Sequence, residues 1–466
     1  MDNQTAKTSF VDKIKSTVSS MSKKTKMIVL ACIIAVVAII VIAIIAGAVS
    51  GSSSKEDTPL FSEGLLCVQQ GKKWGYLGEN GKMKIPAKFD DAYAFAENGL
   101  ALVLDDDEWG YIGKNGKYKI EPEFDAAKGF ASNGLAAVCE DGEWGYINKS
   151  GKFVIKAKFD DAGTFDENGL AVVCVDGEWG VINKKGDYVV KTKYANVGAF
   201  AENGLALVSK YDDDGNSEYG YVNKKGEEVI KLKYQNAISF DENGFASVCE
   251  DGEWGVINKK GDTIVKMSYD YSISFAENGL AAVCLDGEWG YVNKKGKIVI
   301  ELEYDEAYMF ADNGLALVRD GDDYGFINEK GKEVIKTKFE DAMSFGDGKL
   351  TGVCVDGKWG YINKSGKMVI EPQFSGVDNF ASNGLALVEV GGGAYGYIND
   401  NGKFEINPKF DQALGFNYKG GYTIVLFGED TRIIKKNGKY LGEESFDNLH
   451  FQLNPYTFFN NVVPIG

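Results

Sequence analysis

Every tryptophan in this chain is followed by glycine, and the Trp-Gly pairs recur about every 35 residues. Tyr-Gly takes the same place in three further units, and one longer spacing accommodates an insertion at 211–218. A period this constant across most of 466 residues indicates one structural unit copied ten times. The marker residues are Trp74, Trp109, Trp144, Trp179, Tyr219, Trp254, Trp289, Tyr324, Trp359 and Tyr395.

Each unit has the pattern of a three-stranded β-meander. In the fourth unit an apolar run at 170–174 is followed by Asp176-Gly177, a dipeptide that tolerates the positive φ of a tight hairpin. A second strand over 178–182 leads to "NKKG", which suits a turn closing on a left-handed glycine. The third strand, "YVVKTKY", ends in an aromatic residue, and a loop of about a dozen residues returns to the next unit. The chain is therefore predicted to be an all-β repeat protein.

Two further aromatic positions are as regular as the tryptophan. Fifteen residues after it every unit has Phe or Tyr, from Phe89 to Phe410, and 21 after it every unit has Phe, from Phe95 to Phe416. One meander does not bury its own faces, so a stack of units needs the same rings in each layer. We therefore expect the tryptophans to be core residues, with ligand platforms as the lesser alternative. The glycine beside each would let a neighbouring ring lie against the backbone.

The strand pattern also bears on how the units stack. Residues 170–174 are apolar on both strand faces, so each small sheet should be covered on both sides by its neighbours. Ten good units exceed the usual four to eight blades of a propeller, and a degenerate eleventh unit follows, with Thr431 in the tryptophan position. Weakened end units are typical of capped open arrays. We expect an open superhelical stack, with a closed propeller-like ring as the alternative.

The repeated pattern, of which "EWGYINKSGKFVI" at 143–155 is one copy, resembles the WG-repeat family of bacterial proteins. The resemblance covers roughly 61–451. It implies a β-rich scaffold, often in surface-exposed or secreted bacterial proteins, and it carries over no catalytic residues. The tyrosine units and Thr431 depart from the family pattern, and Thr431 puts the edge of the array in doubt.

The N-terminal part differs from the repeats. Residues 27–49 are uncharged and apolar, and as a helix they would span roughly 35 Å, enough to cross a membrane. Lysines precede this run, which places the N-terminus in the cytoplasm and the repeats outside the cell. A cleaved signal peptide ending in "AGA", and secretion, is the alternative. The predicted organisation is a cytoplasmic basic segment 1–26, transmembrane helix 27–49, linker 50–60, ten repeats 61–416, and a degenerate eleventh repeat with C-terminal cap 417–466.

The net charge limits the classes of partner that the chain is expected to bind. The formal charge is -17, and the first fifty residues are basic, so the repeats are more acidic still. Such a body repels nucleic acid, and we exclude nucleic-acid binding. The membrane, through 27–49, and a protein, peptide or envelope glycan remain as expected partners.

Few residues support catalysis or metal binding. His450 is the single histidine, so a histidine-based catalytic triad is possible at that point alone, and imidazole metal clusters are excluded. Cys32 lies in the apolar run. Six other cysteines share one strand face and are expected to be buried thiols, with Cys139–Cys174 and Cys249–Cys284 pairing as the alternative. These six are Cys67, Cys139, Cys174, Cys249, Cys284 and Cys354.

The carboxylates recur at turns and are expected to be solvated. "DDDEWG" at 105–110 and the insertion at 211–218 could bind calcium weakly, but neither has the spacing of an EF-hand loop. "GGGAYG" at 391–396 is expected to be a widened hairpin turn. We predict no catalytic, cofactor-binding or metal-binding residues, and the sequence does not identify the binding residues.

These observations favour a non-enzymatic, membrane-anchored extracellular scaffold for binding or adhesion. One alternative is a carbohydrate-active enzyme with a carboxylate pair in an irregular unit, for which 211–218 is the obvious place. The other is a purely structural spacer.

Overall fold

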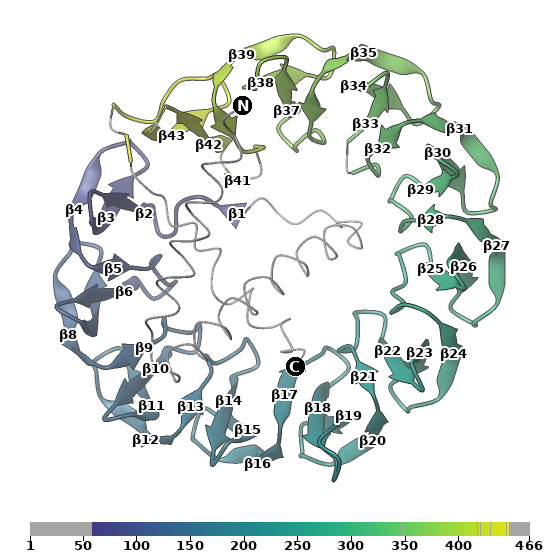
Figure 1. The fold of residues 1–466 in the computed structure, drawn as a ribbon. Helices are drawn as coiled ribbons and strands as arrows, with labels where there is room; N and C mark the ends of the chain where they lie inside the picture. The colour runs from purple at the N-terminus through teal and green to yellow at the C-terminus, as the bar shows by residue number, and fades with distance from the viewer. Residues whose placement is uncertain are drawn as a thin grey trace, which may run out of the picture. The chain divides into compact units, whose positions relative to one another are not determined.

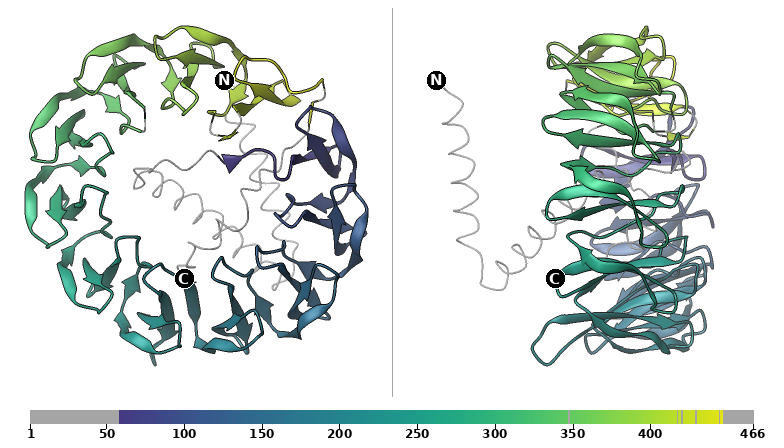
Figure 2. Two further views of the ribbon diagram at one scale, coloured as in Figure 1. Left: turned by 180° about the vertical axis from the view of Figure 1, so that it is seen from behind. Right: turned by 90° about the vertical axis from the view of Figure 1, so that its right-hand side faces the viewer.

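The computed structural model describes residues 58–446, apart from 347, 417, 420, 429 and 444. These residues form eleven small sheets, or blades, arranged in a ring, and all their strand pairs are antiparallel except β1 (Thr58–Pro59) with β41 (Tyr418–Lys419) (Figure 1). The side view in Figure 2 shows the blades standing beside one another around the ring. The all-β repeat architecture is confirmed, and each sheet corresponds to one sequence unit.

A typical blade contains the three predicted long strands and one short strand that the sequence did not predict. In blade 4 the order is β13 (Asp161–Ala162), β14 (Leu170–Val175), β15 (Glu178–Asn183) and β16 (Tyr188–Tyr194). The short strand lies nearest the middle of the ring and the third long strand lies at its circumference (Figure 1). The two-residue strand falls within the predicted loop, where two hydrogen-bonded residues leave no pattern of alternating hydrophobicity.

The other strands repeat this plan. The short strands are β1 (Thr58–Pro59), β5 (Asp91–Ala92), β9 (Ala126–Ala127), β17 (Asn196–Phe200), β21 (Asn236–Ala237), β28 (Glu306–Ala307), β32 (Asp341–Ala342), β36 (Gly376–Val377), β40 (Gln412–Ala413) and β41 (Tyr418–Lys419). The first long strands are β2 (Leu65–Gln70), β6 (Leu100–Asp105), β10 (Leu135–Glu140), β18 (Leu205–Tyr211), β22 (Phe245–Glu250), β25 (Leu280–Leu285), β29 (Leu315–Asp320), β33 (Leu350–Val355), β37 (Leu385–Val390) and β42 (Tyr422–Phe427). The second are β3 (Lys73–Gly78), β7 (Glu108–Gly113), β11 (Glu143–Asn148), β19 (Ser217–Asn223), β23 (Glu253–Asn258), β26 (Glu288–Asn293), β30 (Asp323–Asn328), β34 (Lys358–Asn363), β38 (Ala394–Asn399) and β43 (Asp430–Lys435). The third are β4 (Met83–Phe89), β8 (Tyr118–Phe124), β12 (Phe153–Phe159), β20 (Glu228–Tyr234), β24 (Thr263–Tyr269), β27 (Ile298–Tyr304), β31 (Glu333–Phe339), β35 (Met368–Phe374) and β39 (Phe404–Phe410).

The turns form as their residues predict. Asp176 and Gly177 have φ values of 54° and 77°, so both central residues of this hairpin are left-handed. In the turn at the other end of β11, Asn148 Oδ1 accepts hydrogen bonds from the N–H groups of Ser150 at 2.9 Å and Lys152 at 3.2 Å. The asparagine side chain therefore closes the turn, and Gly151 completes it at a φ of 78°.

The glycine of each Trp-Gly pair is explained by a bulge in the third strand. Trp144 pairs with Phe159 and Tyr146 with Ile155, so β12 spans this interval with two more residues than β11. The extra backbone covers Gly145, where an ideal Cβ would lie 2.6 Å from Ala157 N. The close neighbour is therefore the third strand's backbone and not, as expected, an aromatic ring.

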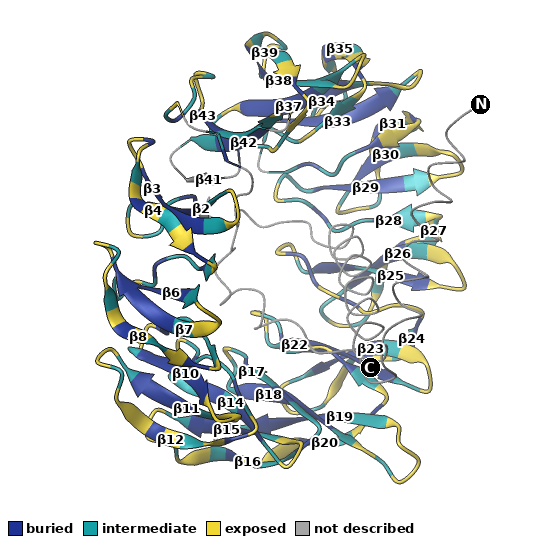
Figure 3. Cartoon of the chain, turned by 60° about the vertical axis from the view of Figure 1, so that its left-hand side comes forward, coloured by how far each residue is buried: buried dark blue, intermediate teal, exposed yellow. Residues whose placement is uncertain are grey.

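The core lies between blades, not within them. Each blade packs both faces against its neighbours, as the strand pattern predicted, and eleven buried clusters join the eleven blades pairwise. Between blades 3 and 4, for example, Tyr146 and Phe159 pack with Phe165 and Val173. Figure 3 shows buried residues along the long strands and exposed residues gathered on the third strands and turns.

The eleventh cluster closes the ring. It joins Leu66 and Val68 of blade 1 to Ile424 and Ile433 of blade 11. In addition, β1 pairs in parallel with β41, so an N-terminal segment belongs to the sheet of the last blade.

The favoured open stack is therefore wrong, and its alternative, the closed ring, is correct. An open array ends in units with a polar outer face. Here both end units have an apolar outer face, which closure buries. The degenerate eleventh unit is a true blade, with Thr431 opposite Leu426 and bridged to Phe446 in place of a regular third strand.

Several predictions fall outside the described residues: the cytoplasmic segment 1–26, the membrane span 27–49 with Cys32, most of the linker 50–60, His450 and the end of the C-terminal cap. Within residues 58–446, apart from the five omitted positions, no helix is long and apolar enough to cross a membrane.

Candidate functional surfaces

The ring has two differently built faces. Because successive strands alternate in direction, the Asp-Gly hairpins lie on one side, which we call the hairpin face. The Asn-x-x-Gly turns and the Glu-Asn-Gly turns lie on the other, the turn face. Contacts between neighbouring blades agree with this assignment: Lys294 Nζ lies 2.9 Å from Asn243 Oδ1 on the turn face.

The two faces also differ in charge. The hairpins are rich in acids: Asp105, Asp106, Asp107, Glu140, Asp141, Asp176, Asp213, Asp214, Glu250, Asp251, Asp286, Asp320, Asp322 and Asp356. The turn face carries a lysine from most blades: Lys114, Lys149, Lys184, Lys224, Lys259, Lys294, Lys330, Lys364 and Lys436. Acids also lie on the turn face, for example Glu167, Glu202 and Glu277, so the faces differ mainly in the lysines that the Asn-x-x-Gly turns add.

The acid that follows most of the third strands has a structural role that the sequence did not reveal. Asp160 Oδ2 accepts a hydrogen bond of 2.5 Å from the N–H of Asp176, in the hairpin of the next blade. In the same way, the N–H of Gly321 donates to Asp305 at 2.7 Å, and the N–H of Gly428 donates to Asp411 at 2.6 Å. These carboxylates are exposed, as predicted, but they also fix the hairpins.

The tryptophans are less buried than expected. Trp74 is 4% exposed, whereas the other six are half-buried at the edges of the clusters between blades. The fully buried ring stands two residues later in most blades, and Tyr76, Tyr146 and Tyr361 are 0% exposed. The indoles therefore contribute to packing while leaving part of each ring accessible near the hairpin face.

The buried tyrosines join neighbouring blades, and the sequence analysis did not identify them. The Tyr146 hydroxyl donates to Gly163 O of the next blade at 2.7 Å, and its ring centroid lies 4.7 Å from that of Phe165. Six other tyrosines make the equivalent hydroxyl contact: Tyr76, Tyr111, Tyr221, Tyr291, Tyr361 and Tyr397. Their recurrence two residues after the marker was the signal that could have revealed them.

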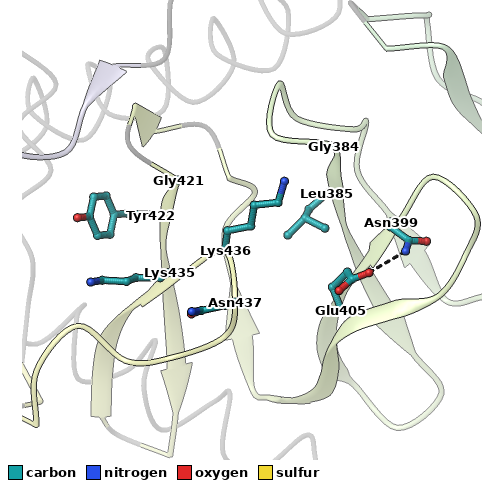
Figure 4. Close-up of a pocket in the computed structure, with 9 residues that line it drawn as sticks. All are labelled: Gly384, Leu385, Asn399, Glu405, Gly421, Tyr422, Lys435, Lys436 and Asn437. Atoms are coloured by element: carbon teal, nitrogen blue, oxygen red, sulfur yellow. Dashed lines mark hydrogen bonds between the residues drawn. The ribbon is translucent and has the colours of Figure 1, made fainter.

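A groove of about 600 Å³ lies on the turn face between blades 10 and 11 (Figure 4). Its lining includes Lys435, Lys436 and Asn437 from blade 11 and Leu385 from blade 10. Glu405 is the single acid among the lining residues, and Asn399 Nδ2 donates to it at 2.8 Å. A carboxylate pair of the kind that hydrolyses glycosides is therefore missing from this groove.

A smaller cavity of about 300 Å³ lies between blades 7 and 8. Three acids line it, Glu303, Asp320 and Glu333. Glu333 Oε1 already accepts from the N–H of Thr337 at 2.8 Å. Tyr304, at the same cavity, has its pKa raised by burial and by these nearby carboxylates.

The two acidic runs are held in local hydrogen bonds. Asp105 and Asp106 lie with Asp90 in a group whose carboxylate oxygens are within 4.8 Å of one another. Lys73 Nζ, however, donates to Asp90 at 2.6 Å, and this hydrogen bond lowers the pKa of Asp90. The lysine thus already supplies a positive charge where a metal ion would bind.

The insertion at 211–218 lengthens the hairpin between β18 and β19. Asp212 Oδ1 accepts from the N–H of Asn216 at 2.7 Å, which lowers the pKa of Asp212. Asn216 Nδ2 also donates to Asp212, at 3.2 Å, so the obvious location for the enzyme alternative is a turn closed by its own hydrogen bonds. Gly393 N bonds to Val390 O at 3.1 Å, and this confirms the predicted widened hairpin at 391–396.

The six cysteines of the described blades are free and buried, as expected. Burial raises the pKa of each thiol, and for Cys284 to about 11. Neutral buried thiols are poor nucleophiles, so none of them is a candidate catalytic residue.

A closed ring of eleven blades, most of them four-stranded, with each core between neighbours and turns on both faces, defines a β-propeller built from sequence repeats. The chain belongs to the family of proteins with the WG containing repeat. That family's profile matches ten segments: 74–109, 109–144, 144–179, 179–212, 219–254, 254–289, 289–322, 324–359, 359–393 and 395–430. No curated protein matches the sequence.

Solved structures give weaker similarities. A eukaryotic initiation factor is 12% identical, with a TM-score of 0.40 over 67% of this chain and 96% of that one. BamB from Moraxella catarrhalis is 11% identical, with a TM-score of 0.26 over 64% and 93%. Sqt1 from Saccharomyces cerevisiae is 13% identical, with a TM-score of 0.27 over 58% and 91%. Similarity at this level carries no argument about function.

Proposed function

We propose that this chain is a non-enzymatic scaffold that binds protein or peptide partners through the faces of its ring. The observation that carries the proposal is repetition: accessible indoles and acidic hairpins recur from blade to blade near one face. Residues on turns held by a rigid framework are where binding groups are usually found. Many equivalent positions also allow several weak contacts to act together.

The test is a binding screen paired with hydrolysis assays, using the full chain solubilised in detergent. Immobilised protein would be exposed to panels of basic, acidic and neutral peptides and to envelope glycans. We expect saturable binding of at least one peptide class without turnover of any glycoside. Turnover that is lost in Glu333→Gln would contradict the proposal and support an enzyme working at the cavity of Glu303, Asp320 and Glu333. Absence of binding to every panel would favour the structural spacer.

We further propose that residues 27–49 anchor the scaffold in the cell membrane with the ring outside. The support is the uncharged apolar run and the lysines before it. External protease on intact cells should remove the ring and leave a membrane-bound N-terminal fragment. Recovery of the whole ring in the medium, with a new N-terminus after Ala48, would instead establish cleavage and secretion.

A further inference from the structure

Among the described residues, blade 7 shares with blade 1 the lack of a short strand at its inner edge. Its sheet is built from β25, β26 and β27, and its described residues include no short strand. Where blades 4 and 8 have Asp161-Ala162 and Glu306-Ala307, blade 7 has Tyr271-Ser272. The Ile273 N–H, in addition, donates to Ser247 Oγ of blade 6 at 2.9 Å. The segment therefore still bonds to β25 at Asp270, whose N–H donates to Cys284 O at 2.9 Å, but turns to the preceding blade by Ile273.

The departure brings a tyrosine to the surface. Tyr271 is 58% exposed and lies flat on Trp289, with ring centroids 5.6 Å apart and planes 9° apart. In blade 2, by contrast, the half-buried Tyr93 meets Trp109 at 64°. Trp289 itself is half-buried, so the exposed aromatic surface of the pair comes mainly from the Tyr271 ring. Its outer face is available to a ligand.

The surroundings of the pair are acidic. Asp270 adjoins Tyr271 and accepts from the N–H of Gly287, 3.4 Å away, in the hairpin that precedes Trp289. Asp286 is exposed in the same hairpin. Aromatic faces and carboxylates both attract cations, and a cation gains from both through its charge, whereas a neutral sugar leaves the two carboxylate charges uncompensated.

The chain itself supplies a template for the ligand. In blade 3, Lys128 Nζ lies 5.0 Å from the centroid of Trp144 and 3.6 Å from Asp161 Oδ1. Trp144 and Trp289 hold the same position in their units. The Trp144 indole is thus covered by a lysine of the chain itself, which lies between the ring and a carboxylate. Among the described residues, no such lysine lies over the Trp289 indole, which stacks on Tyr271 instead.

We propose that the Tyr271–Trp289 pair, with Asp270 and Asp286, binds a lysine or arginine side chain of a partner peptide. This inference rests on the proposed binding function and adds to it a location and a partner chemistry.

The first test measures binding of a fluorescein-labelled decapeptide of alternating lysine and glycine to the full chain in detergent. A matched peptide carries N-acetyl-lysine in place of lysine, and a neutral glucan hexasaccharide serves as the sugar probe. We expect the lysine peptide to bind and both neutral probes to fail. Tyr271→Ala should weaken binding about fivefold to thirtyfold, the range expected for loss of one cation–π contact. Tyr271→Phe should stay within about twofold, because the aromatic face is kept.

The matched control is Tyr211→Ala. Tyr211 is 69% exposed and stands at the acidic hairpin of 211–218, so it shares the charge of the face without belonging to the pair. Its removal should leave the affinity unchanged. Equal losses in Tyr211→Ala and Tyr271→Ala would overturn the site and indicate binding to the charged face as a whole.

A second test uses the internal lysine. Lys128→Ala should uncover Trp144 beside Asp161 and raise the number of lysine peptides bound from one to two per chain. An unchanged stoichiometry would show that an indole and an acid in this arrangement do not suffice, which contradicts the template argument. If the sugar binds and Tyr271→Ala abolishes that binding, the pair is a glycan site and the lysine assignment is wrong, although the scaffold proposal stands. Failure of every probe, while another peptide class binds in the wider screen, would likewise overturn this site alone.

Discussion

Replacing Gly145 with alanine should damage the ring more than replacing Gly177 or Gly391 of the same chain. The new Cβ would meet Ala157 N at 2.6 Å, Ile155 O at 2.8 Å and Ala157 Cα at 2.9 Å, all of them backbone atoms. Ordinary contacts are about 3.5 Å or longer, so the bulged third strand must move by more than half an ångström or lose its pairing with β11. Overpacking against a fixed element typically costs 1–3 kcal/mol, and we expect about 3 kcal/mol here.

Two other glycines separate this clash from backbone strain. Gly177 has a φ of 77° and nothing within 4 Å of its ideal Cβ, so Gly177→Ala should cost about 1–2 kcal/mol from left-handed strain alone. Gly391 has neither a close neighbour nor a positive φ, and Gly391→Ala should change stability by less than about 0.5 kcal/mol.

Hydrogen exchange followed by mass spectrometry is the appropriate assay, because each blade contacts its two neighbours and damage should be local. In Gly145→Ala, protection should fall over 143–159 and in the adjoining blades, while 323–339, in blade 8, stays protected. If Gly145→Ala and Gly391→Ala give the same protection, the close approach of the third strand does not explain why glycine occupies position 145.

Three further changes test the packing between blades. Tyr146→Phe removes the 2.7 Å hydroxyl contact to Gly163 O and should cost about 1 kcal/mol in chemical denaturation, whereas Tyr211→Phe, at an exposed side chain, should cost nothing measurable. Phe165→Ala, at a ring 2% exposed, should cost about 3–5 kcal/mol and more than Trp254→Ala, because the indole is half-buried; the reverse order would restore the tryptophan as the main core residue. Burial, and then the hydrogen bond to Asp270, raises the pKa of Cys284 from 9.0 to about 11, so its contribution to stability is full below about pH 9 and is lost as the pH rises towards 11. The melting temperature of the unmodified chain should therefore fall more steeply over that interval than that of Cys284→Ala, and parallel profiles would show that the thiol does not titrate in this way.

Periodicity was sufficient to predict the blades. The Asp176-Gly177 hairpin, the turn at Asn148 and the third strand ending at Phe159 each follow from local residue chemistry repeated ten times. The short strand was missed because two hydrogen-bonded residues such as Asp161–Ala162 have no alternation of their own. They are ordered by the next strand, which is a tertiary effect.

Ring closure could not be predicted from the sequence, because it depends on whether the first and last units meet in space. Both end units carry apolar residues such as Val68 and Ile433, but their burial on one another requires the summed rotation of eleven blades to return to the start. The rotation from one blade to the next is set by how the blades pack, and the repeat length of 35 residues does not determine it. The binding candidate was equally hidden: Tyr271 is one irregular residue in a loop of many, and its flat contact with Trp289 exists in three dimensions alone.

The distance across the seam between blades 1 and 11 tests the closed ring most directly. Lys82 and Lys439 follow the turn glycines Gly81 and Gly438, as Lys117 and Lys152 do in blades 2 and 3, and all four lysines are exposed. Spin labels introduced as unnatural amino acids leave the native thiols in place, and pulsed dipolar spectroscopy gives both distances. A closed ring predicts that the Lys82–Lys439 distance equals the Lys117–Lys152 distance to within a few ångströms. An open array of eleven sheets packed about 10 Å apart would separate its ends by on the order of 100 Å, and such a distance would contradict the ring.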